Sequence, residues 1–212
     1  MKITLTSKNM QKNLARKKSE SATNAILKEF GYKKKKYKDF HKALIRIKPS
    51  TVPGGGVGVF AVRDLKPNTI IGDVKYMNDD LFFPWSEFKK IDKDSQKIIL
   101  THCIGTVDGF FAPADINHIP LSWHINHKCD NNVGFDSKGN FITIKKIKKN
   151  EELFYDYGLS IFDPKYMMKC NCGSKNCRKA VTGNDWKNPE YRKKKSKYML
   201  SELKEYIRLT IK

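Results

Sequence analysis

Cysteines are the residues of this chain whose type and spacing point most directly to chemistry. Three of them lie close together as Cys-x-Cys-x4-Cys over residues 170–177. Tetrahedral zinc takes four ligands, with thiolates about 2.3 Å from the ion, so this segment is one ligand short. Cys129, two residues after an Asn-His pair, supplies the fourth if the fold brings it beside Cys170. We therefore predict a zinc site whose ligands are Cys129, Cys170, Cys172 and Cys177.

Other ligands and other cysteine chemistry remain open at this point. His124 and His127 are alternative zinc ligands, although the four cysteines already complete a shell. Disulfides are expected less, because residues 170 and 172 are poorly placed to bridge each other and reduced thiols are the rule inside cells. Cys103 stands apart from both cysteine regions, and we expect it to be a small buried apolar residue.

A candidate catalytic tyrosine lies between the two cysteine regions. Tyr157 ends the run Glu-Glu-Leu-Phe-Tyr-Asp-Tyr that begins at residue 151. Upstream, a Pro-Gly-Gly-Gly turn at residues 53–56 precedes a β-rich stretch, and glycines let a backbone approach a ligand closely. Taken singly, these features have ordinary alternatives: a tyrosine at a strand interface, a simple turn, and a capped Asn-His turn.

Together, and in this order, the four motifs resemble those of SET-domain protein lysine methyltransferases with a post-SET zinc segment, over roughly residues 42–182. The resemblance implies S-adenosylmethionine and Zn²⁺ as cofactors. It implies that the side chain of Asn126 holds the methionine moiety and that His127 contributes mainly backbone bonds to the adenine edge. The residues that the resemblance assigns to cofactor binding are Gly56, Val57, Gly58, Asn126 and His127.

The resemblance also implies how the target lysine is handled. Tyr157 would orient the ε-amine in line with the methyl group. Tyr155 stands where the family alternates Phe and Tyr, and an extra hydroxyl there would hold a water that a further methyl must displace. We therefore expect mono- or dimethylation. A second channel tyrosine is not evident upstream, and Phe111 is expected to line the channel instead. The chain departs from the family pattern at Trp123-His124, Lys128, Asn131 and Lys179, which puts the substrate preference in doubt.

Charge is distributed unevenly along the 212 residues, whose net charge is +20. Residues 1–48 carry 15 Lys/Arg against 3 Asp/Glu, whereas residues 49–182 carry 18 against 15. Basic ends of this kind favour non-specific nucleic-acid binding through phosphate neutralisation. Only 6 of the 42 basic residues are arginine, however, and AT-rich coding would produce the same skew. No stretch approaches the roughly 20 apolar residues of a membrane span, so no membrane partner is expected.

Many short apolar stretches separated by Gly and Pro predict a mainly β fold with short helices. We expect strands at 43–47, 57–62 and 69–76, a helix at 85–103, a hairpin over 133–147 and a last strand at 152–157. The resemblance adds several small curled sheets and a knot-like crossing. The expected parts are a basic N-terminal arm and short helix at 1–40, the SET catalytic domain at 41–160, the post-SET zinc segment at 161–182 and a C-terminal basic helix at 183–212.

The sequence thus predicts a protein-lysine N-methyltransferase that acts on histone tails or another lysine-rich protein. The alternative is a catalytically inactive, zinc-stabilised module that binds nucleic acid or chromatin. Residues 1–11 contain no hydrophobic secretory segment, so we expect an intracellular protein. A eukaryotic source would favour the nucleus and chromatin, and a viral source the host cell or the virion.

Overall fold

The computed structural model describes residues 3–34, 42–73 and 80–211. The chain divides into two compact units, Met1–Lys42 and Ala43–Lys212, and each is considered by itself. Within the described residues, none of the helices is both long and apolar enough to cross a membrane. Residues 74–76, the last three of the strand expected at 69–76, fall outside the described residues.

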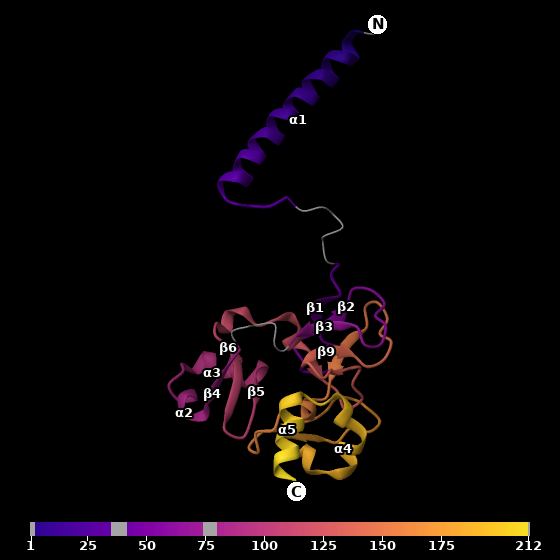
Figure 1. Ribbon diagram of the computed structural model, residues 1–212. Coiled ribbons are helices and arrows are strands. Elements are labelled where there is room, and N and C mark those ends of the chain that lie inside the picture. Colours follow the sequence, from indigo (N-terminus) through magenta and orange to yellow (C-terminus); the bar gives the residue numbers. More distant parts are fainter. Residues whose placement is uncertain (1–2, 35–41, 74–79, 212) are drawn as a thin grey trace. The chain divides into compact units, whose positions relative to one another are not determined.

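The first unit is a single long helix, α1 (Ile3–Glu29), where a flexible arm and a short helix were expected (Figure 1). The difference has a simple cause, because no Gly or Pro interrupts the chain before Gly31 and many of its Lys, Leu, Ala and Gln residues are good helix formers. The helix ends at Glu29, two residues before Gly31. Gly31 has a φ of 71°, and the Tyr32 amide donates to the Leu27 carbonyl at 2.8 Å, as at a helix end capped by a left-handed residue.

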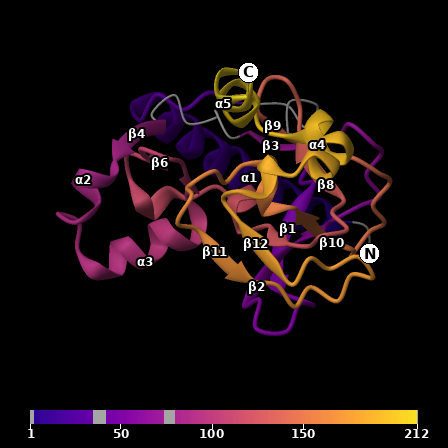
Figure 2. The ribbon, with the colours of Figure 1, turned by 90° about the horizontal axis from the view of Figure 1, so that it is seen from below.

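The second unit is mainly β with short helices, as predicted (Figures 1 and 2). Its largest sheet has the strand order β1-β2-β10-β8-β9-β3, and β7 also pairs with β10. The strands are β1 (Ile45–Pro49), β2 (Val57–Ala61), β3 (Ile70–Asp73), β7 (Asn126–His127), β8 (Val133–Phe135), β9 (Asn140–Thr143) and β10 (Glu152–Tyr155).

Strand β10 is the centre of this arrangement. It pairs antiparallel with β2 and parallel with β7 and β8. The Asn-His pair, the Gly-rich turn before β2 and the segment leading to Tyr157 are therefore neighbours in space. The knot-like crossing expected from the sequence stays a prediction.

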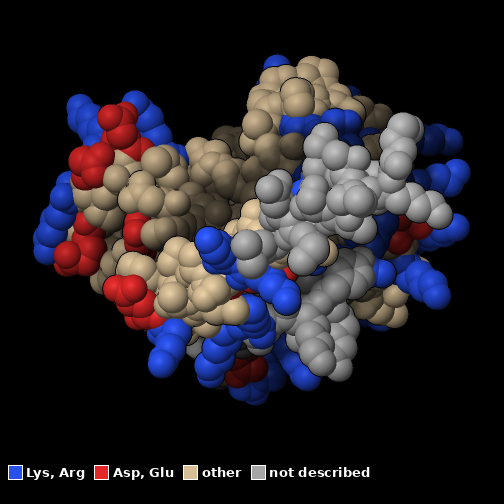
Figure 3. All heavy atoms as spheres, turned by 90° about the horizontal axis from the view of Figure 1, so that it is seen from above, with Lys and Arg blue, Asp and Glu red and all other residues tan. Residues whose placement is uncertain are grey.

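A separate three-stranded sheet forms from β4 (Asp80–Pro84), β5 (Ile104–Gly105) and β6 (Gly109–Pro113). It was not predicted, because β6 is apolar without alternation and gives no period-2 signal. The helix expected at 85–103 is two helices, α2 (Trp85–Phe88) and α3 (Lys93–His102). Asp92 separates them, since its carboxylate accepts from the amides of Asp94 and Ser95 and caps α3. In Figure 3, acidic atoms gather on the lobe at the left, which carries α2 and α3.

The C-terminal part wraps back onto the large sheet. Strands β11 (Met167–Lys169) and β12 (Ala180–Thr182) pair antiparallel around the cysteine segment. In place of the single helix expected at 183–212 come α4 (Pro189–Lys195) and α5 (Ser201–Thr210). Short 3-10 turns complete the fold at η2 (Ile116–His118), η3 (Leu121–His124), η4 (Tyr157–Leu159), η5 (Asp185–Lys187) and η6 (Ser196–Tyr198).

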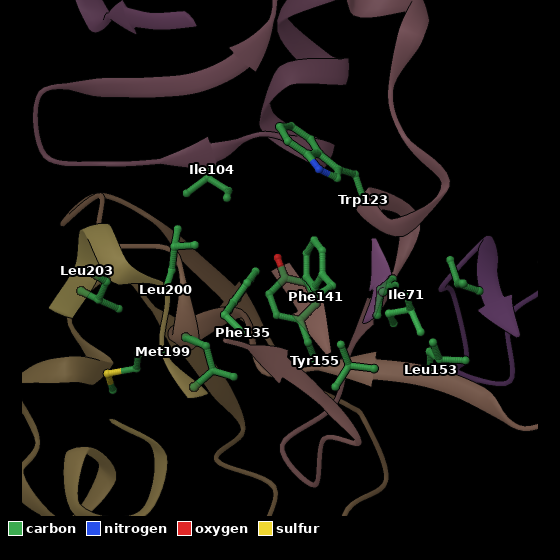
Figure 4. Packing of buried hydrophobic residues seen from close by; sticks show 14 of the residues in the cluster. Ile71, Ile104, Trp123, Phe135, Phe141, Leu153, Tyr155, Met199, Leu200 and Leu203 are labelled. Carbon is green, nitrogen blue, oxygen red and sulfur yellow. The ribbon is translucent and has the colours of Figure 1, made fainter. Parts of the chain in front are cut away.

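One apolar cluster joins the C-terminal part to the sheet (Figure 4). Met199, Leu200 and Leu203 are at most 1% exposed and belong to the same cluster as Phe135 and Tyr155. Burying three such side chains stabilises the fold by roughly 1.5–3 kcal/mol each. The C-terminal part is therefore an integral piece of the second unit.

Candidate functional site

The Gly-rich turn is held against β10 by one buried carboxylate. Glu152 is 3% exposed and accepts from the hydroxyl of Ser50 at 2.7 Å and from the amide of Thr51 at 2.7 Å. A Cβ on Gly58 would lie 2.0 Å from Glu152 Oε1, so only glycine fits there. The turn itself requires left-handed residues, since φ is 75° at Gly54 and 59° at Gly56.

Asn126 joins the same turn from β7. Its Nδ2 donates to the carbonyl of Val57 at 2.7 Å and to that of Gly55 at 3.3 Å. Because the amide nitrogen is engaged with the turn, Oδ1 is the atom that Asn126 can offer to a donor on a ligand. The turn and the Asn-His strand thus form one continuous surface.

Two hollows meet on this surface. One, of about 330 Å³, is lined by Gly54, Asn126, His127 and the post-SET-like residues Met168 to Cys172. The other, of about 340 Å³, is lined by residues 54–57, His102, Trp123, His124 and Asn126. Tyr157, Thr101, Gly54, Gly55 and Asn126 line both. We call residues 167–182, which carry Cys170, Cys172 and Cys177, the cysteine tail. An elongated ligand fits this pair of hollows, with one end over the cysteine tail and the other beside the Gly-rich turn.

Tyr157 lies where the hollows meet. Its hydroxyl donates to the carbonyl of Ile125 at 3.4 Å. Its ring packs against that of Tyr155, which is 9% exposed, with the centroids 4.8 Å apart and the planes tilted by 47°. Burial raises the pKa of Tyr157 to about 12, and burial also raises the pKa of Tyr155. Both phenols are therefore neutral at physiological pH, and Tyr157 can position a group but is not a phenolate base.

The four cysteines converge, although they come from regions 41 to 48 residues apart in sequence. The Sγ atoms of Cys129 and Cys170 are 3.9 Å apart, and those of Cys170 and Cys177 are 3.6 Å apart. Tetrahedral zinc with bonds of about 2.3 Å separates its sulfur ligands by roughly 3.8 Å. These two separations match edges of a zinc tetrahedron.

The surroundings of the thiols also fit a cation. The amide of Cys129 donates to Cys172 Sγ, and that of Arg178 donates to Cys129 Sγ, at 3.5 and 3.4 Å. Burial raises the pKa of both Cys129 and Cys170, whereas the N–H of Cys129 and the hydroxyl of Ser174 outweigh burial and lower the pKa of Cys172 to about 6. Buried thiols whose sulfurs receive N–H bonds suit a divalent ion, which deprotonates the thiols that bind it.

His127 also lies within ligand distance of this cluster, and its hydrogen bonds decide its role. Its Nε2 is 3.4 Å from Cys129 Sγ, and it belongs to a group with Cys129, Cys170 and Cys172 whose ligand atoms all lie within 4.8 Å of one another. However, its Nδ1 accepts from the amide of Tyr157 at 3.2 Å. Burial lowers the pKa of His127 to about 4, so the ring is neutral and the proton sits on Nε2. That nitrogen faces Cys129 Sγ. Cys177 is not part of the group that includes His127, so the ligand set of four cysteines stays a prediction.

A buried charge network joins the segment of the two tyrosines, the cysteine segment and helix α4. The sequence did not reveal this network. Asp156, between the two tyrosines, has a fully buried side chain and receives two bonds of 2.7 Å from Arg178. Burial alone would raise the pKa of Asp156, but Arg178 holds it below its usual value. Lys195 of α4 is 3.6 Å from Asp156 and donates to the carbonyl of Cys129. The position of Arg178 directly after Cys177 was the only signal in the sequence.

The remaining predicted residues lie as follows. Gly56, Val57, Asn126 and His127 line the two hollows, whereas Gly58 lies behind them against Glu152. Phe111 lines a different groove, described below. His124 lies away from the cysteines and packs on His102 at 4.5 Å beside Asn126. Cys103 is half-buried and packs against two apolar clusters.

Comparison with known proteins finds one matching family model and several curated relatives. Residues 56–158 match the SET domain. The chain is 28% identical over 131 residues to the Drosophila melanogaster histone-lysine N-methyltransferase trr and 30% identical over 132 residues to the Homo sapiens histone-lysine N-methyltransferase 2D. Each alignment covers 58% of this chain, but the chain spans only 5% and 2% of the length of these relatives.

Among solved structures, the chain is similar to a humanized mutant of the Chaetomium thermophilum Polycomb Repressive Complex 2 bound to an inhibitor. The TM-score is 0.41 at 21% identity, over 57% of this chain and 16% of that chain. An apo form of the complex with two mutations in Ezh2 gives the same values.

Proposed function

Because residues 56–158 form a SET domain, we propose that the chain is an S-adenosylmethionine-dependent protein-lysine N-methyltransferase. The observation that carries the proposal is the position of Tyr157 at the junction of the two hollows. One hollow is beside the Gly-rich turn and Asn126, and the other is under the cysteine tail. The named relatives are histone-lysine N-methyltransferases, which supports the same reaction class.

In the proposed reaction, the cofactor supplies a sulfonium-bound methyl group. The neutral ε-amine of a lysine forms the new N–C bond as the S–C bond breaks, and the ammonium product loses one proton to water. The amino-acid ammonium group of S-adenosylmethionine would donate to Asn126 Oδ1 and to carbonyls of the Gly-rich turn. The hydroxyl of Tyr157 orients the amine, and the buried walls around it exclude water, so that positioning and a dry environment carry most of the acceleration.

Zn²⁺ is proposed as a structural ion at Cys129, Cys170, Cys172 and Cys177. Its role is to hold residues 167–182 over the hollow that they line together with Asn126 and His127. Tyr155 is proposed to limit the product to mono- or dimethyl-lysine, because its hydroxyl keeps a polar group next to the ring of Tyr157.

The proposed substrate is a histone tail or another lysine-rich protein, and the proposed location is chromatin. The relatives' names and the basic ends of the chain support this choice. The same basic ends support non-specific contacts with nucleic acid. The rival function, an inactive binding module, would need neither Tyr157 nor Asn126 at the hollows.

Thermal stabilisation by the cofactor tests the proposal. At about 100 times its Kd, a ligand stabilises by roughly 2.7 kcal/mol, which raises the Tm of a chain of this size by about 5–10 °C. We expect this shift for the wild-type chain and its loss in Asn126→Ala, with Asn117→Ala in an exposed turn as the control. Stabilisation by DNA without any shift from the cofactor, and no methyl transfer to mixed histones, would favour the rival.

A further inference from the structure

A second concavity of about 520 Å³ lies between the β4–β6 sheet and α5. It shares no residue with the two hollows at Tyr157 and lies entirely within the second unit. We call it the acidic groove, and its lining residues are Phe82, Thr106, Asp108, Phe111, Phe162, Ser201, Glu202, Glu205, Tyr206 and Leu209. Helix α5 lies outside the matched SET domain.

The groove has an apolar floor that is incompletely covered. The rings of Phe82 and Phe111 meet edge to face at 5.5 Å, and those of Phe162 and Tyr206 lie 5.2 Å apart. Phe82 is 47% exposed and Leu209 is 63% exposed. Exposed apolar side chains on both walls of one concavity are typical of a surface that binds a partner.

The rim of the groove has the opposite charge from the rest of the chain. Among the described residues, its charged side chains are Asp108, Glu202 and Glu205, with no Lys or Arg in the lining, although the chain has a net charge of +20. Glu205 pairs with Arg208 one turn along α5, but both side chains are more than half exposed, and exposed pairs of this kind contribute little to stability. A basic partner can therefore compete for Glu205.

The groove is within reach of the reactive centre. Phe162 on its floor follows Tyr157 by five residues, which at about 3.3–3.6 Å per residue places the two at most about 18 Å apart. The link is fixed at both ends, since the amide of Ile161 donates to the carbonyl of Tyr157 and that of Phe162 to the carbonyl of Gly105, both at 3.0 Å. A peptide of about six extended residues spans the same distance.

We propose that the acidic groove binds a lysine- or arginine-rich segment of the protein substrate, within about six residues of the target lysine, with one apolar side chain on the aromatic floor. The inference rests on the proposed function. Charge complementarity selects the occupant: the carboxylates attract a basic peptide and repel the phosphates of a nucleic acid. The groove thereby sets which lysines are methylated, according to the sequence that flanks them.

Peptide binding without cofactor tests the proposal separately from catalysis. The probe is a fluorescein-labelled histone H3 tail peptide, measured by anisotropy, beside a copy in which every Lys and Arg except one lysine is replaced by Gln. The double variant Asp108→Asn/Glu205→Gln should weaken binding of the first peptide about three- to tenfold and leave the second unchanged. The weakening should shrink at high salt.

Matched controls change the same charge elsewhere. Glu87→Gln/Asp94→Asn removes two exposed carboxylates of α2 and α3, each paired with a lysine three residues away. Leu209→Ser tests the floor, and Leu100→Ser removes a leucine of similar exposure from α3. Equal effects of the groove and control variants would overturn the proposal. A concentration-dependent dimer, detected by sedimentation and dissociated by Leu209→Ser, would also overturn the proposal.

The two hypotheses fail in different ways. If the groove variants weaken peptide binding while no methyl transfer occurs, the groove stands and the proposed function fails. If methyl transfer occurs and the groove variants behave like their controls, the proposed function stands and the groove assignment fails.

Discussion

Arg178 forms a bidentate ion pair with Asp156, in which Nη1 donates to Oδ2 and Nη2 to Oδ1, each at 2.7 Å. Asp156 separates the two tyrosines of the site, and Arg178 directly follows the last cysteine of the tail. The same guanidinium bonds Asp185 at 2.9 Å. The tail is thus fixed to the tyrosine segment by a charge network as well as by the cysteines.

Removing Arg178 should therefore be costly. Arg178→Met leaves Asp156 buried without its main partner, and breaking a buried pair in this way costs about 3–5 kcal/mol. Urea unfolding measures the change. Arg208→Met, which removes the exposed pair with Glu205, should change the free energy of unfolding far less. Equal losses of unfolding free energy in the two variants would show that the buried network stabilises the fold no more than the exposed pair does.

Metal removal should act on the tail before it acts on the sheet. Binding energy from structural zinc is also folding energy, so chelation should expose residues 163–182 to limited proteolysis and abolish methyl transfer. Far-UV circular dichroism should change little. Cys170→Ser should reproduce the effect and reduce the zinc content measured by atomic absorption, whereas Cys103→Ser should not. A metal-free chain with full activity would contradict the structural role.

Tyr157→Phe removes one hydroxyl and keeps the ring. If that hydroxyl positions the amine, kcat should fall by about 10²-fold, as for loss of one preorganised hydrogen-bonding group. Cofactor binding measured by calorimetry should be nearly unchanged. Tyr198→Phe, at the C-terminal turn η6, is the control. A variant with wild-type kcat would remove Tyr157 from the reaction.

Tyr155→Phe addresses the product instead of the rate. Without the hydroxyl, a water at this position loses its partner, and the methylated lysine gains room. We expect mass spectra to shift from mono- and dimethyl-lysine towards trimethyl-lysine. The account of Tyr155 fails if the wild-type chain already gives mainly trimethyl-lysine, or if the variant gives an unchanged distribution.

The pH dependence should follow the substrate amine. The free lysine has a pKa of about 10.4, so the rate should rise from pH 7 to pH 10 as the neutral amine becomes available. Burial raises the pKa of Tyr157 to about 12, so its phenol stays neutral over this range. Between pH 10 and 12 this tyrosine is deprotonated in the unfolded chain but still protonated in the folded chain. The free energy of unfolding therefore falls as pH rises. A rate that decreases as the pH is raised from 7 to 10, in a chain shown to be folded, would contradict this assignment.

The sequence predicted the parts of the site whose chemistry is carried by residue type. Cysteine spacing indicated which sulfurs converge, because few other intracellular roles use that pattern. The mainly β fold followed from short apolar stretches and turns. The Asp156–Arg178 bond could not be predicted, since nothing local links positions 22 residues apart. The length of α1 was underestimated because its lysine-rich first half was taken as a basic arm, and Asp92 was not recognised as a cap that divides residues 85–103.

Transfer of a heavy-isotope methyl group tests the central claim most directly. Core histones are incubated with the zinc-loaded chain and deuteromethyl-labelled S-adenosylmethionine, and the lysines are then mapped by mass spectrometry. The account predicts labelled mono- or dimethyl groups on lysine ε-nitrogens, lost with Tyr157→Phe and retained with Tyr198→Phe. Unlabelled histones, from a zinc-loaded chain that binds the cofactor, would contradict it.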